Sequence, residues 1–438
     1  MNLWGVTALT AAGTVGGLMV LMPYFVPTEY IRSTTEVPAV EEIRSDSEGI
    51  DDTREVVAHV LLPDQVKAIY MTACVAGTSD FRNRLVTLIE ETEINAVVID
   101  IKDYSGTISF PPVSEAWKSA WSAATCGTSD MREFIAHLHK KNIFVIGRIT
   151  VFQDPFYAPL HPEYAVKRSD GVTVWKDHKG LSFIDVGARG YWDHIVELSV
   201  DSYNVGFDEL NFDYVRYPSD GNMKDIAFVE SMKGEYGSDK QANLEAFFKY
   251  LNEKLDDEEL FASFRHENTG RDTTTPWTSV DLFGMTTTNY DDLSIGQVQE
   301  RAAPYFDFVA PMVYPSHYPD SFLGLGDPND YPYKVVNYAM QHGVDRMMSS
   351  TTPMEGFQHT RIGTSTPARY SKPVYTGDRL RTWIQDFDYG GDYDAADVRA
   401  QIQASYDAGV DSFMVWAPSN IYTRAALEAE NVAVHSVE

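Results

Sequence analysis

The sequence has little cysteine. Among its 438 residues only Cys74 and Cys126 carry thiols. Two thiols and scattered histidines are too few for a disulfide-stapled scaffold or for a zinc cluster. We therefore expect two free buried thiols. A single bridge between them is the alternative if the chain is exported to an oxidising compartment.

Positive charge is also scarce, with 35 basic residues against 64 acidic ones and a net charge of -29. A surface this negative repels nucleic acid phosphates, so we exclude nucleic acid as a partner. Aromatic residues, by contrast, make up 13% of the chain. That fraction is typical of proteins that hold sugar rings against aromatic faces, and equally of proteins with a large aromatic core.

Residues 3–26 contain no charged side chain. A helix of this length can cross the hydrocarbon core of a bilayer. No Lys or Arg precedes the run, which favours an uncleaved membrane anchor over residues 1–26 rather than a removed signal peptide. Residues 27–64 hold ten acidic and three basic residues and are predicted to form a spacer. We expect residues 65–438 to form a folded body on the extracytoplasmic side of the cell envelope.

In the body, short apolar runs alternate with amphipathic stretches, which predicts a parallel sheet wrapped by helices. Helices are expected at 78–92, 130–141, 190–203 and 240–255, a small hairpin within 152–189, and further loop excursions at 257–278 and 349–378. Eight runs suit an α/β fold of the (β/α)8 TIM barrel type with loop insertions. An open doubly wound sheet is less favoured, because no Gly-rich phosphate turn follows the first run. The eight runs begin near residues 67, 95, 143, 206, 279, 307, 380 and 411.

Active sites of such barrels lie at the carboxyl ends of the strands, so the polar residues that close each run are the candidates. Several carboxylates gathered on one rim can supply the acid and the nucleophile or base that glycoside hydrolysis needs. Aromatic side chains on the same rim are candidates for a sugar platform, and its cations suggest a substrate that bears a carboxylate or a phosphate. The candidates are Asp100, Lys102, Asp103, Arg148, Asp213, Arg216, Asp281, Tyr314, Asp386 and Trp416.

Each carboxylate also has a structural interpretation. Asp213 precedes Arg216 by three residues and can form an ion pair with it, and Asp100 and Asp103 flank Lys102. Residues 386–397 space acidic residues partly as a calcium loop does, but the pattern departs from that motif at two positions. We therefore expect no metal and no cofactor.

Several strings resemble a family of bacterial proteins known as domain of unknown function 4015, glycosyl hydrolases whose barrel is related to the α-amylase-like enzymes. The strings with the strongest resemblance are GFDELNFDYVRYPSDG (206–221) and APMVYPSHYP (310–319), and NAVVIDIKDYSGTISF (95–110) supports them. By position, the resemblance implies Asp213 as the nucleophile, Asp281 as the proton donor and Asp386 as the stabilising carboxylate. The donor in α-amylase-like enzymes is usually Glu, which leaves Asp100 and Asp103 as substitutes.

The sequence therefore predicts a glycoside hydrolase that cleaves an extracellular or cell-envelope polysaccharide through two strand-end carboxylates. The alternative is a non-catalytic carbohydrate-binding surface protein on the same scaffold. A metal-dependent barrel enzyme is the third possibility.

Overall fold

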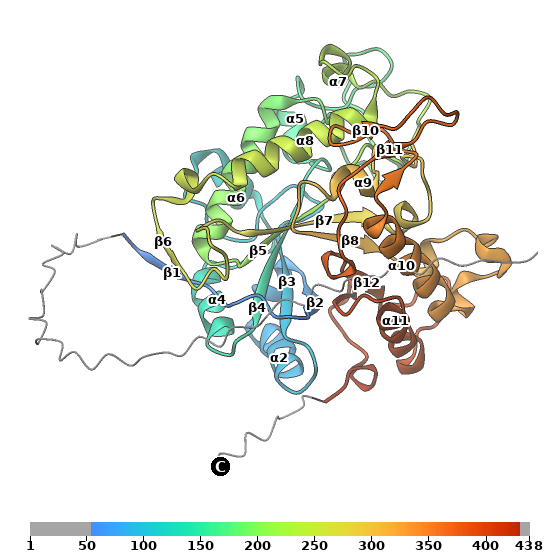
Figure 1. Cartoon of the computed structure of the whole chain (residues 1–438). Helices are drawn as coiled ribbons and strands as arrows, with labels where there is room; N and C mark the ends of the chain where they lie inside the picture. Colours follow the sequence, from blue (N-terminus) through green and yellow to red (C-terminus); the bar gives the residue numbers. More distant parts are fainter. Residues whose placement is uncertain (1–53, 430–438) are drawn as a thin grey trace, which may run out of the picture. The chain divides into compact units, whose positions relative to one another are not determined.

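The computed structural model describes residues 54–429, and within them eight parallel strands close into a barrel. Each strand pairs with the next one along the chain, and the last pairs with the first, as expected of a (β/α)8 barrel (Figure 1). All eight apolar runs form strands, so the predicted barrel is confirmed. The strands are β2 (Lys67–Met71), β3 (Ala96–Lys102), β4 (Phe144–Thr150), β5 (Glu209–Asp213), β7 (Trp277–Phe283), β8 (Phe308–Met312), β12 (Thr382–Gln385) and β13 (Phe413–Trp416).

Helices surround this barrel in Figure 1 and cover the outer faces of its strands. The four predicted helices form as α2, α4, α6 and α8. In α2, for example, Leu85, Val86 and Ile89 recur at helical spacing and are buried. The longer helices are α2 (Ser79–Glu90), α4 (Met131–His139), α6 (Arg189–Val205), α8 (Lys240–Leu255), α10 (Pro332–Met348) and α11 (Ala395–Asp407). The shorter ones are α1 (Ala73–Ala76), α3 (Lys118–Ala123), α5 (Tyr157–Leu160), α7 (Val229–Lys233) and α9 (Gln299–Ala302).

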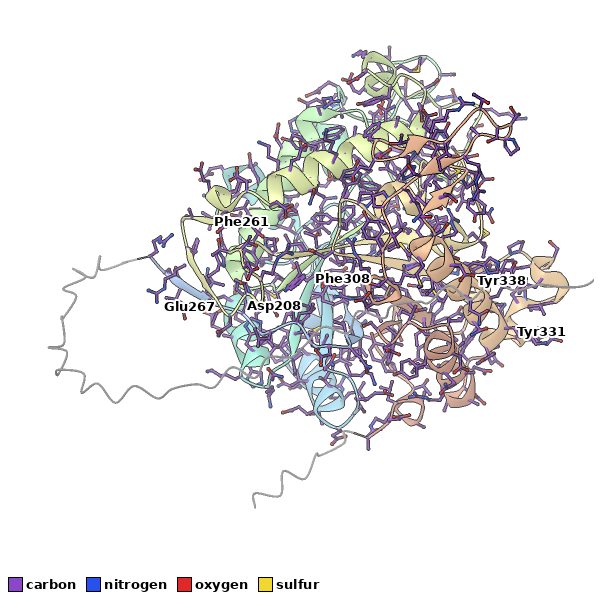
Figure 2. All side chains as sticks on the ribbon, in the orientation of Figure 1. Asp208, Phe261, Glu267, Phe308, Tyr331 and Tyr338 are labelled. Atoms are coloured by element: carbon purple, nitrogen blue, oxygen red, sulfur yellow. A yellow bond between two sulfur atoms is a disulfide. The ribbon has the colours of Figure 1, made fainter. Side chains whose placement is uncertain are left out.

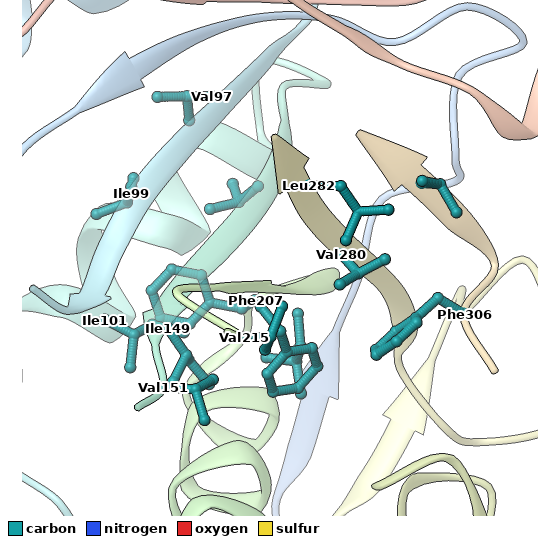
Figure 3. Packing of buried hydrophobic residues seen from close by; sticks show 14 of the residues in the cluster. Val97, Ile99, Ile101, Ile149, Val151, Phe207, Val215, Val280, Leu282 and Phe306 are labelled. Carbon is teal, nitrogen blue, oxygen red and sulfur yellow. The ribbon is translucent and has the colours of Figure 1, made fainter. Parts of the chain in front are cut away.

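Side chains along the strands alternate between the helical layer and the barrel interior, because the side-chain period of a strand is two. In β3, Val97, Ile99 and Ile101 point outward into the main apolar core, which Figure 3 shows from close by. Ala96 and Val98 point inward and contact apolar side chains of other strands. The same alternation directs Asp100 inward, one step further along β3 towards its carboxyl end.

The amino-terminal half of the interior contains a buried ion pair. Arg381, just before β12, donates from Nη1 to both carboxylate oxygens of Glu209 on β5, at 2.7 Å each. Both residues are at most 1% exposed. The pair joins the residue before β12 to the first residue of β5, and these two strands are not neighbours in the barrel.

The folded body begins earlier than the predicted boundary at residue 65. Strand β1 (Val56–Ala58) pairs in parallel with β6 (Arg265–Glu267), and Val57 and His59 are buried. The His59 ring contacts Asp208, which lies at the amino end of β5 and is labelled in Figure 2. The expected spacer therefore does not reach residue 64, because residues from Arg54 onward belong to the body.

All three predicted excursions contain secondary structure, and 257–278 includes β6. Within 349–378, strands β9 (Thr351–Thr352), β10 (Thr360–Arg361) and β11 (Tyr370–Ser371) form a small antiparallel sheet. Within 152–189, Lys167 and Val174 form an antiparallel bridge around the predicted turn, and Asp170 accepts the backbone N–H groups of Val172 and Thr173.

Cys74 and Cys126 are joined by a disulfide, with a Cα–Cα distance of 4.4 Å. The preference for two free buried thiols was therefore wrong, because the loop after β3 brings Cys126 against α1. The apolar run at residues 3–26 lies outside the described residues. Among residues 54–429, no helix has the length and apolar character needed to cross a bilayer.

Candidate active site

A cavity of about 370 Å³ opens at the carboxyl ends of the barrel strands. We call it the catalytic cavity. Its wall combines two carboxyl groups, two guanidinium groups and a majority of aromatic or apolar side chains, as is usual for small-molecule sites. The residues that line it are Arg148, Asp213, Tyr214, Arg216, Asp281, Phe283, Gly284, Met285, Met312, Tyr314, His317, Tyr318, Trp383 and Trp416.

Arg148 on β4 links two of the predicted carboxylates. Its Nη1 donates to Asp100 Oδ1 at 2.7 Å, and its Nη2 donates to Asp213 Oδ2 at 2.5 Å. Burial acts to lower the pKa of Arg148, but the adjacent carboxylates of Asp213 and Asp100 outweigh it and hold that pKa well above its usual value. Arg148 is therefore a permanent cation. Its charge-assisted hydrogen bonds hold one oxygen of Asp213, whose other oxygen accepts the backbone N–H of Tyr214.

Asp100 lies on the neighbouring strand and is 2% exposed. Burial raises the pKa of its carboxyl, Arg148 lowers it, and the balance places it at about 6. The Tyr70 hydroxyl donates to its second oxygen. Both oxygens of Asp100 are thus occupied, which makes it a support for Arg148 rather than a free acid.

Asp281 on β7 has different surroundings. Its Oδ1 accepts hydrogen bonds from Asn211 Nδ2 at 2.9 Å and from Trp383 Nε1 at 2.8 Å, and both donors are neutral. Burial, followed by the nearby charge of Asp213, raises the pKa of Asp281 well above its ordinary value. Asp281 therefore retains a proton under conditions in which an exposed aspartate has lost it.

The strand register places these two carboxyl groups next to each other. Phe212 pairs with Val280, so Asp213 and Asp281 follow at adjacent positions on β5 and β7. Neighbouring strands lie about 4.8 Å apart. The Asp213 carboxyl group, paired with a guanidinium, and the Asp281 carboxyl group, whose pKa is raised, consequently face the same cavity from adjacent strands.

Aromatic rings form the walls beside these carboxyl groups. Trp416 stacks on Tyr70 with ring centroids 4.0 Å apart, and its indole lies edge to face with Trp383 at 5.6 Å. The Arg148 guanidinium lies 5.1 Å from the Trp416 ring centroid. Tyr214 adopts a left-handed backbone with φ of 51°, a strained conformation that turns the chain at the rim directly after Asp213.

A second cavity of about 570 Å³, which we call the side cavity, shares part of this wall. Arg148, Tyr214, Arg216 and Trp416 line both cavities. Asp100 faces the side cavity, together with groups from the loops after β3, β4 and β5. Its remaining lining consists of Tyr70, Thr72, Tyr104, Gln153, Asp177, Lys179, Leu181, Phe183, Ser219, Asp220 and Pro418.

Three predicted site residues line neither cavity. Lys102 is completely buried and pairs with Asp154 at 3.0 Å, because the strand register shifts between Asp100 and Lys102 and turns its side chain aside. Asp103 caps a turn by accepting the Ser105 N–H at 2.8 Å. The salt-bridged network expected around Lys102 is therefore replaced by the Lys102–Asp154 pair.

Asp386 is the third predicted site residue that lines neither cavity. Its carboxylate accepts the backbone N–H of Thr423 at 2.8 Å and the Thr423 hydroxyl at 2.7 Å. Asp386 follows Gln385, the last residue of β12. The stabilising role that the resemblance implies for Asp386 stays a prediction.

The expected ion pair between Asp213 and Arg216 does not form, because Asp213 pairs with Arg148 instead. Sequence reasoning also missed Tyr70 and Trp383, which hold Asp100 and Asp281. Their signal was present in the period of two, since both lie at inward-facing positions of apolar runs.

Among the described residues, no three His, Cys, Asp or Glu side chains are grouped so that they could hold a metal ion. In the acidic loop 386–397, Asp394 and Asp397 form a capping box at the start of α11. These residues therefore have a helix-capping role.

The chain is similar to several solved structures. The glycoside hydrolase domain of PgaB (BpsB) from Bordetella bronchiseptica is 12% identical, covers 83% of this chain and 98% of its own, and has a TM-score of 0.52. A hypothetical protein from Ruminiclostridium thermocellum is 30% identical over 43% of this chain and 92% of its own, with a TM-score of 0.38. No curated protein sequence matches the chain.

The model of one protein family matches residues 68–422, which include all eight barrel strands except the first residue of β2. The family is domain of unknown function 4015, described as "Putative glycosyl hydrolase domain". The match covers the residues that line both cavities, so the family assignment and the site refer to the same part of the chain. This protein belongs to that family of glycosyl hydrolase domains.

Proposed function

We propose that this glycosidase cleaves an extracellular or cell-envelope polysaccharide with retention of configuration, with Asp213 as the nucleophile and Asp281 as the general acid and base. The observation that carries the proposal is the asymmetry of two adjacent carboxyl groups. Asp213 is bound by a guanidinium, whereas Asp281 accepts hydrogen bonds from neutral groups only. When two neighbouring carboxyl groups have such different surroundings, they can take the separate roles of acid and nucleophile in one site.

In the first step, a carboxylate oxygen of Asp213 attacks the anomeric carbon while Asp281 gives its proton to the departing glycosidic oxygen. The carbon–oxygen bond to the leaving sugar breaks and an ester to Asp213 forms. In the second step, Asp281 accepts a proton from water, which attacks the same carbon and releases Asp213 as a carboxylate. Retention requires closely spaced carboxyl groups, and adjacent positions on paired strands supply such spacing.

The rest of the catalytic cavity suits a sugar ring. Trp416 and Tyr314 present aromatic surface beside the carboxyl groups, and Met285 and Met312 add apolar contact. The side cavity extends the site beyond a single sugar, which favours a polymer over a monosaccharide glycoside. Burial, with the charges of Asp281 and Asp213, holds the pKa of Tyr314 well above its usual value, so its hydroxyl remains a donor.

An extracytoplasmic location is supported by the Cys74–Cys126 disulfide, since such bonds persist in oxidising compartments. The uncharged run at residues 3–26 is long enough for a membrane anchor. Both features agree with a polysaccharide outside the cytoplasm as the substrate.

The test is hydrolysis of a panel of bacterial and plant polysaccharides by the full-length protein, with product release measured by reducing-end assay. Asp213→Asn and Asp281→Asn are each expected to lower kcat by at least about 10²-fold, the low end of the contribution of an acid–base catalyst. Asp345→Asn, an exposed aspartate on α10, is the matched control and is expected to keep full activity. Full activity of Asp213→Asn on a glycan that the wild-type protein cleaves would refute the assignment.

The carbohydrate-binding alternative gains support from one contact, the tight pairing of Asp213 with Arg148. A carboxylate held in this way can be purely structural. Calorimetric binding of a glycan without any product over several days would favour this second function.

A further inference from the structure

Three cations were expected at the rim, and the structure neutralises two of them. Arg148 pairs with Asp100 and Asp213, and Lys102 pairs with Asp154. Arg216 is different, because no acidic side chain among residues 54–429 forms an ion pair with it. Its hydrogen bonds run from Nη1 to the Tyr217 carbonyl at 3.3 Å and to Ser219 Oγ at 3.1 Å.

Two aromatic rings hold the Arg216 guanidinium in place. Its centre lies 4.8 Å from the centroid of Tyr214 and 4.9 Å from that of Phe283. Such contacts fix the plane of the group without neutralising its charge. The hydrogen bonds to Tyr217 and Ser219 both use Nη1, and the Tyr214 hydroxyl also interacts with the guanidinium. The opposite edge of the group is formed by Nε and Nη2. This edge is the one that binds a planar carboxylate through two parallel hydrogen bonds.

Arg216 lies on the wall shared by the catalytic and side cavities. In the side cavity, exposed Lys179 forms no ion pair within the described part of the chain and adds a second positive charge. The carboxylates there are already engaged. Asp177 accepts the backbone N–H groups of Lys179 and Leu181, each at 2.8 Å, and Asp220 faces His178 at 3.8 Å.

We propose that Arg216 determines specificity for a uronic acid residue, whose carboxylate it binds in the side cavity next to the scissile bond. The substrate class is then an acidic polysaccharide built with hexuronic acid, and Lys179 assists at the outer edge of the same subsite. This inference rests on the proposed function, because that function identifies the ligand as a sugar. It concerns recognition, however, and is tested by binding rather than by turnover.

The test uses full-length protein carrying Asp281→Asn, so that ligands are not consumed. Calorimetry compares tetragalacturonate, tetramannuronate and a glucuronate-containing tetrasaccharide with the carboxyl-reduced, neutral form of each. At least one acidic form is expected to bind roughly 10- to 100-fold more tightly than its neutral form, the range of charge-assisted hydrogen bonds. Adding Arg216→Gln is expected to remove this preference, so that the acidic and neutral forms bind with equal affinity.

Two further variants separate recognition from folding. Arg216→Lys keeps the charge but lacks the planar two-donor edge, and it is expected to keep only part of the preference. Arg84→Gln, which removes an exposed arginine on α2, is the matched control and is expected to bind as the parent does. Thermal unfolding of every variant checks that loss of preference does not follow loss of structure.

Equal affinity for the acidic and neutral forms of all three oligosaccharides overturns the proposal, as does a preference that survives Arg216→Gln. Displacement of tetragalacturonate by sulfate at lower concentration than by glucuronate shows that a tetrahedral anion is preferred, and it overturns the carboxylate assignment. A uronate preference without hydrolysis of any glycan by the wild-type protein refutes the glycosidase mechanism and leaves this inference intact. Hydrolysis of a glycan without a uronate preference supports the glycosidase mechanism and overturns this inference.

Discussion

Removing the cation at the centre of the site provides the most direct test of its electrostatics. Arg148→Met keeps much of the side-chain length and packing against Trp416 but removes the guanidinium. Three hydrogen bonds are lost, one to Asp100 and two to Asp213, and both carboxyl groups are then buried without their cation. Breaking a buried ion pair by removing one partner costs about 3–5 kcal/mol, and we expect a loss of unfolding free energy in this range near pH 8.

The loss should depend on pH in a defined direction. In the wild-type protein the pKa of Asp100 is about 6, because burial raises it and Arg148 partly offsets the burial. Without Arg148 this pKa rises further above its value in the unfolded chain, so the folded variant binds a proton that the unfolded variant releases. The contribution of Asp100 is then fully present below the unfolded pKa of about 3.9 and is lost as pH rises through the folded pKa. The deficit relative to wild type is therefore expected to grow between pH 5 and pH 8.

Urea unfolding at pH 5, 6, 7 and 8, followed by tryptophan fluorescence, measures this deficit. Arg84→Met is the control for the loss of one positive charge, since Arg84 is exposed on α2. Adding Asp100→Asn to Arg148→Met should restore part of the stability at pH 8, because it replaces a buried charge with a neutral amide. A deficit below about 1 kcal/mol, the value typical of an exposed pair, or one independent of pH, would show that Arg148 does not carry a buried network.

Three more outcomes follow from the same structure. Because burial and Asp213 raise the pKa of Asp281, kcat should fall as pH rises through that pKa, and Trp383→Phe should move the fall to higher pH by removing a hydrogen bond that lowers it. A pH–rate profile of both proteins on one cleaved glycan measures this. Cys74→Ser opens a disulfide that spans 52 residues and should lower the unfolding free energy by about 4 kcal/mol, as measured by urea unfolding. Arg381→Met leaves Glu209 buried without its partner and should destabilise the barrel by about 3–5 kcal/mol, with little change in KM for the glycan.

The fold was predictable because each barrel strand is buried on both faces and so appears as a short apolar run between helical stretches. The boundary at residue 65 was wrong for a physical reason. Strand β1 is short and lies among acidic residues, and its pairing partner β6 is about 200 residues away in sequence. Local composition contains no information about such a contact. The disulfide was not predicted for the same reason, because Cys74 on α1 and Cys126 come together only when the chain packs.

The site was predictable in part. Asp213, Asp281 and Arg148 lie in the carboxyl-terminal parts of apolar runs, and any barrel places such residues towards one rim. Which of the candidate side chains face the interior depends on the direction in which each one leaves its strand. Asp281 lines the catalytic cavity, whereas Asp386 does not. The register shift after Asp100 turned Lys102 aside, and it has no counterpart in the residue pattern. Asp213 pairs with Arg148 on the neighbouring strand and not with Arg216, which is nearer in sequence. The sequence alone does not show which of the two arginine side chains points towards Asp213.

In the proposed mechanism, the charges inside the rim determine which carboxyl group acts as the acid. Asp100, Asp213 and Asp281 would carry three negative charges if all were ionised, and Arg148 contributes a single positive one. Its guanidinium contacts Asp100 and Asp213 but forms no hydrogen bond with Asp281. An ionised Asp281 would stand beside the Asp213 carboxylate with only the Asn211 amide and the Trp383 indole as donors. Retention of a proton by Asp281 reduces the repulsion among the three groups, and that proton is the one that a leaving sugar needs.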